Sequence, residues 1–262
     1  MPEASYSPEG EPGYDEVQRA HDRFINVLHV HGAAIVAFEV LPALPSIEEQ
    51  ISAGLRLRRG MKPENPHSPT IEQASDMLKI MEAERGRGHE VIRSSALVAA
   101  CGAFEYLIKA TFVSQASMQP DEAAKLLDGT KIKLLASDVL GMPKMEQWYA
   151  IADVLFDQMP HRQMHERVKQ FLAQYVYMPQ RSEPVAKLEE ALAAIDAHRL
   201  DEAFLLRNCV VHNGGRVSKA LARHTNRGVG QRIIFGNGVL APLLSPMKKL
   251  ADWMHSLYSG FL

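Results

Sequence analysis

The sequence has few cysteines and no long apolar run, and each absence excludes a class of protein. Only two of its 262 residues are cysteine. That is too few for a disulfide framework, so a reducing compartment is the simpler expectation. The longest charge-free runs, residues 24–38 and 233–247, have 15 residues each, whereas a membrane span needs about 20 apolar residues. The acidic start also differs from a signal peptide. We therefore expect a cytoplasmic protein with no membrane contact.

Acidic residues are missing from one long stretch, although the whole chain is nearly neutral. The chain carries 29 Lys and Arg against 31 Asp and Glu, a net charge of -2, which argues against a generally basic nucleic-acid coat protein. No acidic residue lies between Glu202 and Asp252, and the basic residues there give a local charge of +8. Such a segment suits a polyanion such as RNA, because each cation set against a phosphate releases a counterion. A basic face that pairs with the acidic remainder of the protein is the alternative. The candidate RNA-binding residues are Arg216, Lys219, Arg223, Arg227 and Arg232.

The spacing of apolar residues, close to 3.6, predicts an all-α protein. Long helices are expected over 14–40, 90–115 and 240–261, and two helices that meet near residue 197 are expected over 183–212. Glycines and prolines divide residues 120–178 into three or four short helices. This Met-rich stretch is either an adaptable partner surface or, the favoured interpretation, an irregular core. The sequence thus predicts an up-and-down helical bundle.

The order of these elements predicts three parts of the chain. Residues 1–13 are expected to be disordered, 14–68 to form an N-terminal helical extension with a second helix over 46–59, and 69–262 to form the bundle domain, whose first helix runs to Glu84. Near its end the bundle is expected to hold at most a small β-hairpin, at 230–240, where β-branched residues precede a Gly-Asn-Gly turn.

The basic segment contains the sequence FLLRNCVVHNGG at residues 204–215. On a helix, Asn208 and His212 differ by about 40° and share a face, whereas Arg207 lies about 140° from His212 and must reach around with its long side chain. The Asn-Gly-Gly that follows stops a helix. His212 is therefore expected in the last turn, where the helix dipole favours a protonated imidazole.

The run Arg-Asn-x-Val-Val-His-Asn-Gly-Gly at the end of a Leu-rich helix resembles the signature of the HEPN superfamily, in particular its ribonuclease-like branch among toxins and phage-defence proteins. The apolar helix that contains residues 103–107 is similar to an upstream family helix with an inward-facing acidic residue, here Glu105. The close match covers residues 204–215, and residues 1–68 resemble no part of the family.

The resemblance implies a metal-independent endoribonuclease in which Arg and His side chains of two protomers meet in a cleft on the dimer axis. It implies that Arg207 stabilises charge on the scissile phosphate and that His212 transfers a proton, while Asn208 orients one of them. Attack by the 2'-OH would leave a 2',3'-cyclic phosphate and a 5'-hydroxyl. Neither a metal nor another cofactor is expected. In a toxin or defence system, an antitoxin or regulatory protein would silence the enzyme, with residues 1–68 as its candidate docking surface.

Structural alternatives exist for each of these residues. Arg and His near the end of a helix often only satisfy the last carbonyl groups, and Glu105 lies four residues before Lys109, as in an ordinary helix ion pair. Such a chain could equally be a non-catalytic helical dimerisation module, or one that binds nucleic acid or a nucleotide. The distance between the two His212 side chains of a dimer would distinguish the enzyme from the module.

Two further patterns are weaker evidence for a catalytic or metal site. Cys209 lies three residues before His212, but its apolar neighbours favour a packed thiol over a nucleophile. His161 and His165 have the spacing of a helical metal site, yet Arg162 stands where the metalloprotease motif requires Glu. No metal site is therefore expected.

Overall fold

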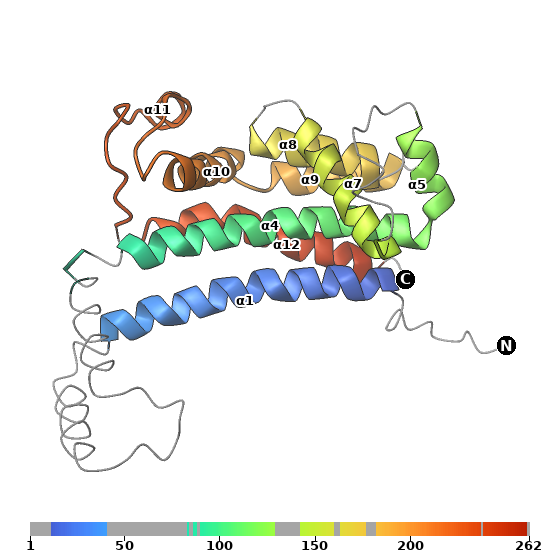
Figure 1. Cartoon of the computed structure of the whole chain (residues 1–262), viewed down its shortest axis with the longest axis horizontal. Coiled ribbons are helices and arrows are strands. Elements are labelled where there is room, and N and C mark those ends of the chain that lie inside the picture. Colours follow the sequence, from blue (N-terminus) through green and yellow to red (C-terminus); the bar gives the residue numbers. More distant parts are fainter. Residues whose placement is uncertain are drawn as a thin grey trace, which may run out of the picture.

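The computed structural model describes residues 12–40, 83, 86–87, 90–128, 142–159, 163–176, 182–236 and 238–260, and these residues fold into an all-α bundle (Figure 1). Among them no β-strand occurs. The predicted helix over 46–59, the predicted helix over 69–84 except residue 83, and the domain boundary at residue 69 lie outside the described residues and stay predictions. Residues 1–11 of the segment expected to be disordered also lie outside them, whereas Pro12 and Gly13 already belong to a helix.

Three long helices run along the bundle: α1 (Pro12–Val40), α4 (Glu90–Met118) and α12 (Leu240–Gly260). Helix α1 lies antiparallel along α4 and α12, on the side away from α7 (Lys144–Gln158) and α10 (Ala197–His212) (Figure 1). Val17, Ala20 and Phe24 of α1 are fully buried in the common core, where Phe24 and Phe104 have ring centroids 6.0 Å apart. The predicted helix over 14–40 is confirmed, and it shares one core with residues from 90 to 260.

A buried polar cluster also holds α1 in place. Glu16, 7% exposed, accepts hydrogen bonds from the phenols of Tyr106 on α4, at 2.7 Å, and of Tyr149 on α7. Burial is the main cause that raises the pKa of Tyr149, and the hydrogen bond to the Glu16 carboxylate is the second. The phenol therefore keeps the proton that it donates. One carboxylate therefore joins three helices.

Helix α4 is the central helix, as its apolar sequence predicts. It is buried around much of its circumference, and the apolar run is interrupted inside the helix by Arg93, Glu105 and Lys109. Within the described residues it is also the one helix long and apolar enough to span a membrane, and 67% of that apolar window is buried in the protein. A core helix of a bundle satisfies the same criterion of length and composition.

The predicted series of short helices is confirmed after α4. It consists of α5 (Pro120–Leu127), α7 (Lys144–Gln158) and α8 (Met164–Phe171), which continues as the π-helical turn η2 (Leu172–Val176). Met159 and Met164 are each 6% exposed. These two methionines therefore fill the core, in line with the favoured interpretation of this stretch.

The two helices predicted over 183–212 are α9 (Ser182–Ala193) and α10 (Ala197–His212). They meet at Asp196, whose side chain accepts a hydrogen bond from the backbone N–H of Arg199 and caps α10. After α10, Gly214 and Gly215 have φ values of 57° and 73°. L-residues rarely adopt this left-handed conformation, so the two glycines end the helix at the predicted place.

A short helix that the sequence analysis missed, α11 (Lys219–Thr225), follows and is capped by the hydroxyl of Ser218. The chain then returns toward the end of α10. In place of a hairpin around the Gly-Asn-Gly turn, the described residues contain a single antiparallel bridge between Arg216 and Arg232. The sequence predicted at most one small hairpin in this region, and a single bridge agrees with that prediction.

Candidate functional site

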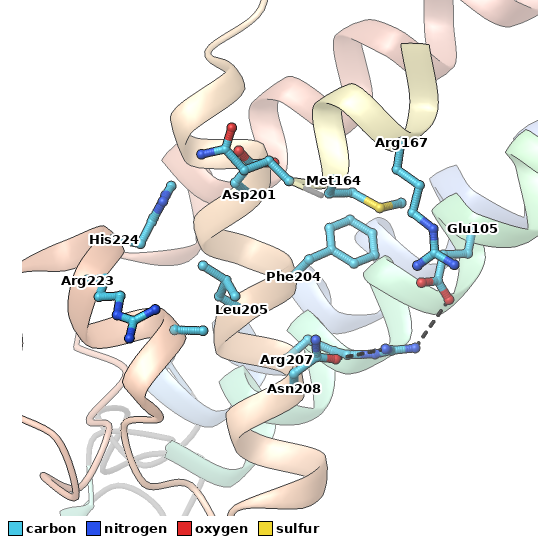
Figure 2. Close-up of a pocket in the computed structure, with 12 residues that line it drawn as sticks. Glu105, Met164, Arg167, Asp201, Phe204, Leu205, Arg207, Asn208, Arg223 and His224 are labelled. Atoms are coloured by element: carbon cyan, nitrogen blue, oxygen red, sulfur yellow. Dashed lines mark hydrogen bonds and ion pairs between the residues drawn. The ribbon is translucent and has the colours of Figure 1, made fainter. Parts of the chain in front are cut away.

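A groove of about 430 Å³ lies between α8, α10 and α11, with α4 at one end (Figure 2). We call it the α10 groove. Five of its residues come from α10, and four of these (Asp201, Phe204, Leu205 and Asn208) have the spacing i, i+3, i+4 and i+7, which places them on one face of that helix. Its lining consists of Glu105, Gln163, Met164, Arg167, Asp201, Phe204, Leu205, Arg207, Asn208, Ala220, Arg223 and His224.

Three of the four predicted catalytic residues meet at the end of this groove. The guanidinium of Arg207 lies 3.2 Å from the Glu105 carboxylate and donates a second hydrogen bond, 3.0 Å long, to the side-chain oxygen of Asn208 (Figure 2). Lys109, the alternative partner of Glu105, is instead paired with Asp153 on α7. Glu105 therefore faces α10.

The fourth residue, His212, lies outside the groove. It is exposed in the last turn of α10, and its side chain contacts no hydrogen-bonding or ionic partner among the residues described. Four residues of helix place it about 40° and about 6 Å along the axis from Asn208. His212 thus continues the groove-facing stripe of α10 one turn further, where the imidazole is open to solvent.

Exposed apolar side chains occur at the end of α10, at the start of α4 and in the loop before α12. Val211 is 49% exposed, Val91 at the start of α4 is 55% exposed, and Ile234 in the loop before α12 is 66% exposed. Hydrogen bonds from Arg93 to the carbonyl of Phe235 and ion pairing of the same loop with Glu90 keep this loop against α4. The same loop is also bonded to the turn after α10, because the Ile233 N–H donates to the Gly215 carbonyl at 2.8 Å. Two exposed apolar side chains, Val211 and Ile234, therefore lie on segments that meet at the end of α10.

The predicted RNA-binding residues fall into two groups. Arg227 pairs with Glu202 at 3.8 Å and Arg232 with Glu90 at 3.2 Å. Arg216 donates to the carbonyl of Gly230. In the described part of the chain, Lys219 and Arg223 have no ion pair. The basic segment is thus partly neutralised, and Lys219 and Arg223 lie on α11, the helix that lines one side of the groove.

Of the residues that α8 and α11 contribute to the groove, only Arg223 was predicted as a binding residue from the sequence. Arg167 donates to the carbonyl of Phe156 and lies 4.4 Å above the Phe156 ring. His224 stacks on His198, with centroids 3.9 Å apart, and donates a 2.9 Å hydrogen bond to the His198 carbonyl. No sequence spacing links these residues to α10, because the helices meet only through tertiary packing.

The weaker sequence patterns are structural where they are described. Cys209 is 1% exposed and its sulfur accepts a hydrogen bond from the backbone N–H of Ser218, as a packed thiol does. The ring Nδ1 of His165 lies 2.8 Å from the buried Asp201 carboxylate, which ties α8 to α10. His161 lies outside the described residues. Within them, no group of three His, Cys, Asp or Glu side chains is arranged to hold a metal.

Comparison with protein-family models, with curated proteins and with solved structures gives no match to this chain.

Proposed function

We propose that the protein is a metal-independent endoribonuclease of the HEPN type, which acts as a cytoplasmic homodimer and serves as a toxin or phage-defence effector. The observation that carries the proposal is the arrangement of Arg207, Asn208 and His212 along α10, with Arg207 oriented by the Glu105 carboxylate at 3.2 Å. The motif alone is short. The tertiary ion pair adds an independent reason to place Arg207 in a built site.

The chemistry that this arrangement supports needs a cation and a proton carrier. A guanidinium has five N–H donors, and only two of its nitrogens are used by Glu105 and Asn208. The remaining donors of Arg207 can stabilise the charge that develops on the phosphate oxygens. His212, exposed and without a partner among the described residues, can take the proton of the 2'-OH or give one to the 5'-oxygen.

A second protomer completes this site. One His212 cannot be both base and acid for the same phosphate in one step, and it lies a helical turn beyond the groove of its own chain. Val211, its neighbour in the sequence, and Ile234, in the loop bonded to the turn after α10, are exposed apolar side chains that a second copy would cover. We expect the dimer to bring the two imidazoles within about 10 Å of each other, so that both reach one phosphate.

The second candidate is a non-catalytic module that binds nucleic acid or a nucleotide. It is favoured by the location of His212 outside the groove and by the engagement of Arg207 with a carboxylate. Such a module would need the cations of α11 and the groove, but not the imidazole.

The experiment that separates the two candidates is RNA cleavage in EDTA with analysis of the product ends. The parent protein is expected to leave 2',3'-cyclic phosphate and 5'-hydroxyl ends. His212→Ala should lose about 100-fold or more of the rate, in the range for a general acid or base. His29→Ala, which removes an exposed histidine on α1, is the matched control and should cleave like the parent. RNA binding without cleavage would leave the module as the function, and full activity of His212→Ala would refute the role proposed for this imidazole.

A further inference from the structure

The α10 groove extends well beyond the ion pair at its end. Its floor is apolar and buried, with Met164 and Phe204 each 6% exposed and Leu205 half-buried beside them. Its rim is polar and exposed, and includes the amides of Gln163 and Asn208. A floor that excludes water below a rim that forms hydrogen bonds is typical of a ligand site.

The amides at the rim match the edge of a nucleobase. Each amide group can donate and accept hydrogen bonds, as the edges of the bases require. The Asn208 oxygen accepts from Arg207, so its NH₂ group remains as a donor toward the groove. A volume of about 430 Å³ lies within the range of small-molecule sites. A single flat base therefore suits the groove in size and in polarity.

The wall on the α11 side supplies charge. Lys219 and Arg223 are four residues apart on α11, so they share a face, and neither has an ion pair among the residues described. The His224 ring is fixed at this wall by its stacking on His198 and its hydrogen bond to the His198 carbonyl. Two free cations beside an apolar slot can neutralise the phosphates that flank a base held in it.

We propose that the α10 groove binds one unpaired nucleobase of an RNA strand whose phosphates lie along Lys219 and Arg223. The substrate is then single-stranded RNA or a loop, because a base in a duplex would have to leave its stack and its partner to enter the groove. This inference rests on the proposed function for the identity of the ligand. It places the bound base on the stripe of Leu205 and Asn208, one helical turn from His212.

The test measures binding separately from cleavage. The full chain carrying His212→Ala is titrated, in EDTA, with a short fluorescent RNA strand and with the same strand paired to its complement. Ala220→Trp fills the groove from α11 without removing a charge, and Ala241→Trp, at an exposed alanine of α12 outside the groove, is its matched control. The strand should bind about tenfold more tightly than the duplex. Ala220→Trp should remove this preference and Ala241→Trp should keep it.

Three results would overturn the proposal. They are equal affinity for strand and duplex, equal behaviour of Ala220→Trp and Ala241→Trp, and a free mononucleotide (AMP, GMP, CMP or UMP) that binds more tightly than the strand. The last result would assign the groove to a free nucleotide. Cleavage of RNA by the parent protein is measured in a separate assay. If the protein binds the single strand in preference to the duplex but cleaves no RNA, only the proposed enzyme activity is refuted. If it cleaves RNA but shows no such preference, only the proposal for the groove is refuted.

Discussion

Arg207 and Glu105 are 102 residues apart in the sequence, and their side chains form an ion pair 3.2 Å long between α10 and α4. Both side chains are mostly buried, with 25% and 20% exposed. A pair at this depth is less screened by water than a surface pair, and it fixes one helix against the other.

The first prediction is a measurable coupling within this pair. Glu105→Gln and Arg207→Gln should each lower the free energy of unfolding. The double variant should lose less than the sum of the two, with a coupling of about 1 kcal/mol. Urea unfolding of the four proteins of the cycle measures this quantity. Strictly additive losses would show that the pair does not join the helices energetically.

The second prediction concerns the free cations of α11. For single strands, the slope of log affinity against log salt has a magnitude of about 0.7 for each phosphate that the protein neutralises, so Lys219→Ala with Arg223→Ala should reduce it by about 1.4. The control, Arg227→Ala with Arg232→Ala, removes the same number of charges. Those two arginines are already paired with Glu202 and Glu90, so their removal should change the slope less. Anisotropy titrations at several salt concentrations measure both slopes, and a larger change in the control would contradict the assignment.

The third prediction is a loss of stability in mild acid at the interface between α1 and α12. The rings of His21 and His255 stack with centroids 4.4 Å apart. Burial, and then the neighbouring His21, lower the pKa of His255, while Asp22 and Asp252 oppose the shift. The unfolded chain therefore takes up a proton near the ordinary histidine pKa of about 6.5 before the folded protein does.

The stability that His255 contributes is consequently present above about pH 6.5 and is lost as the pH falls toward its lowered pKa in the folded protein. His255→Phe keeps a ring in the stack and removes this titration, so its Tm should change less than that of the parent between about pH 7 and 5. Thermal unfolding over this range measures the difference. His29→Ala on the exposed side of α1 should follow the parent curve.

The fourth prediction tests whether α1 belongs to the core. Phe24 is fully buried, so Phe24→Ala should cost about 3–5 kcal/mol of unfolding free energy. Val30→Ala, at a side chain that is 64% exposed, should change stability by less than about 0.5 kcal/mol. Chemical unfolding compares the two. Tests of residues 1–68 as a docking surface should therefore keep residues 12–40, because a chain without α1 loses part of its core.

The sequence predicted those elements whose signals are local. Helix α10 begins after Asp196 and ends before Gly214, and a capping carboxylate and a left-handed glycine can both be recognised without tertiary contacts. Helix α11 was missed because it is short and has only the Ser218 cap as a signal. The longer helix α10 thus has a recognisable signal at each end, whereas the short helix α11 has a signal at one end only.

The candidate site was predicted only in part for a related reason. Arg207, Asn208 and His212 lie within one short motif, so they could be found together. Arg167 and His224 reach the groove from other helices. Arg167 donates to Phe156 on α7, and His224 contacts His198 on α10, which is 26 residues away in the sequence. Residues brought together by packing between helices leave no fixed spacing in a single sequence.

The hydrogen bond between His21 and Asp252 spans 231 residues and joins the helix that is synthesised early to the one that is synthesised late. At about 5–20 residues per second, the roughly 200 residues between α1 and α12 take about 10 to 40 seconds to translate. During this interval the apolar surfaces of α1 and α4 that α12 covers in the folded protein have no partner on the ribosome. Until α12 emerges, we therefore expect these surfaces of the nascent chain to be available to chaperones that hold apolar segments.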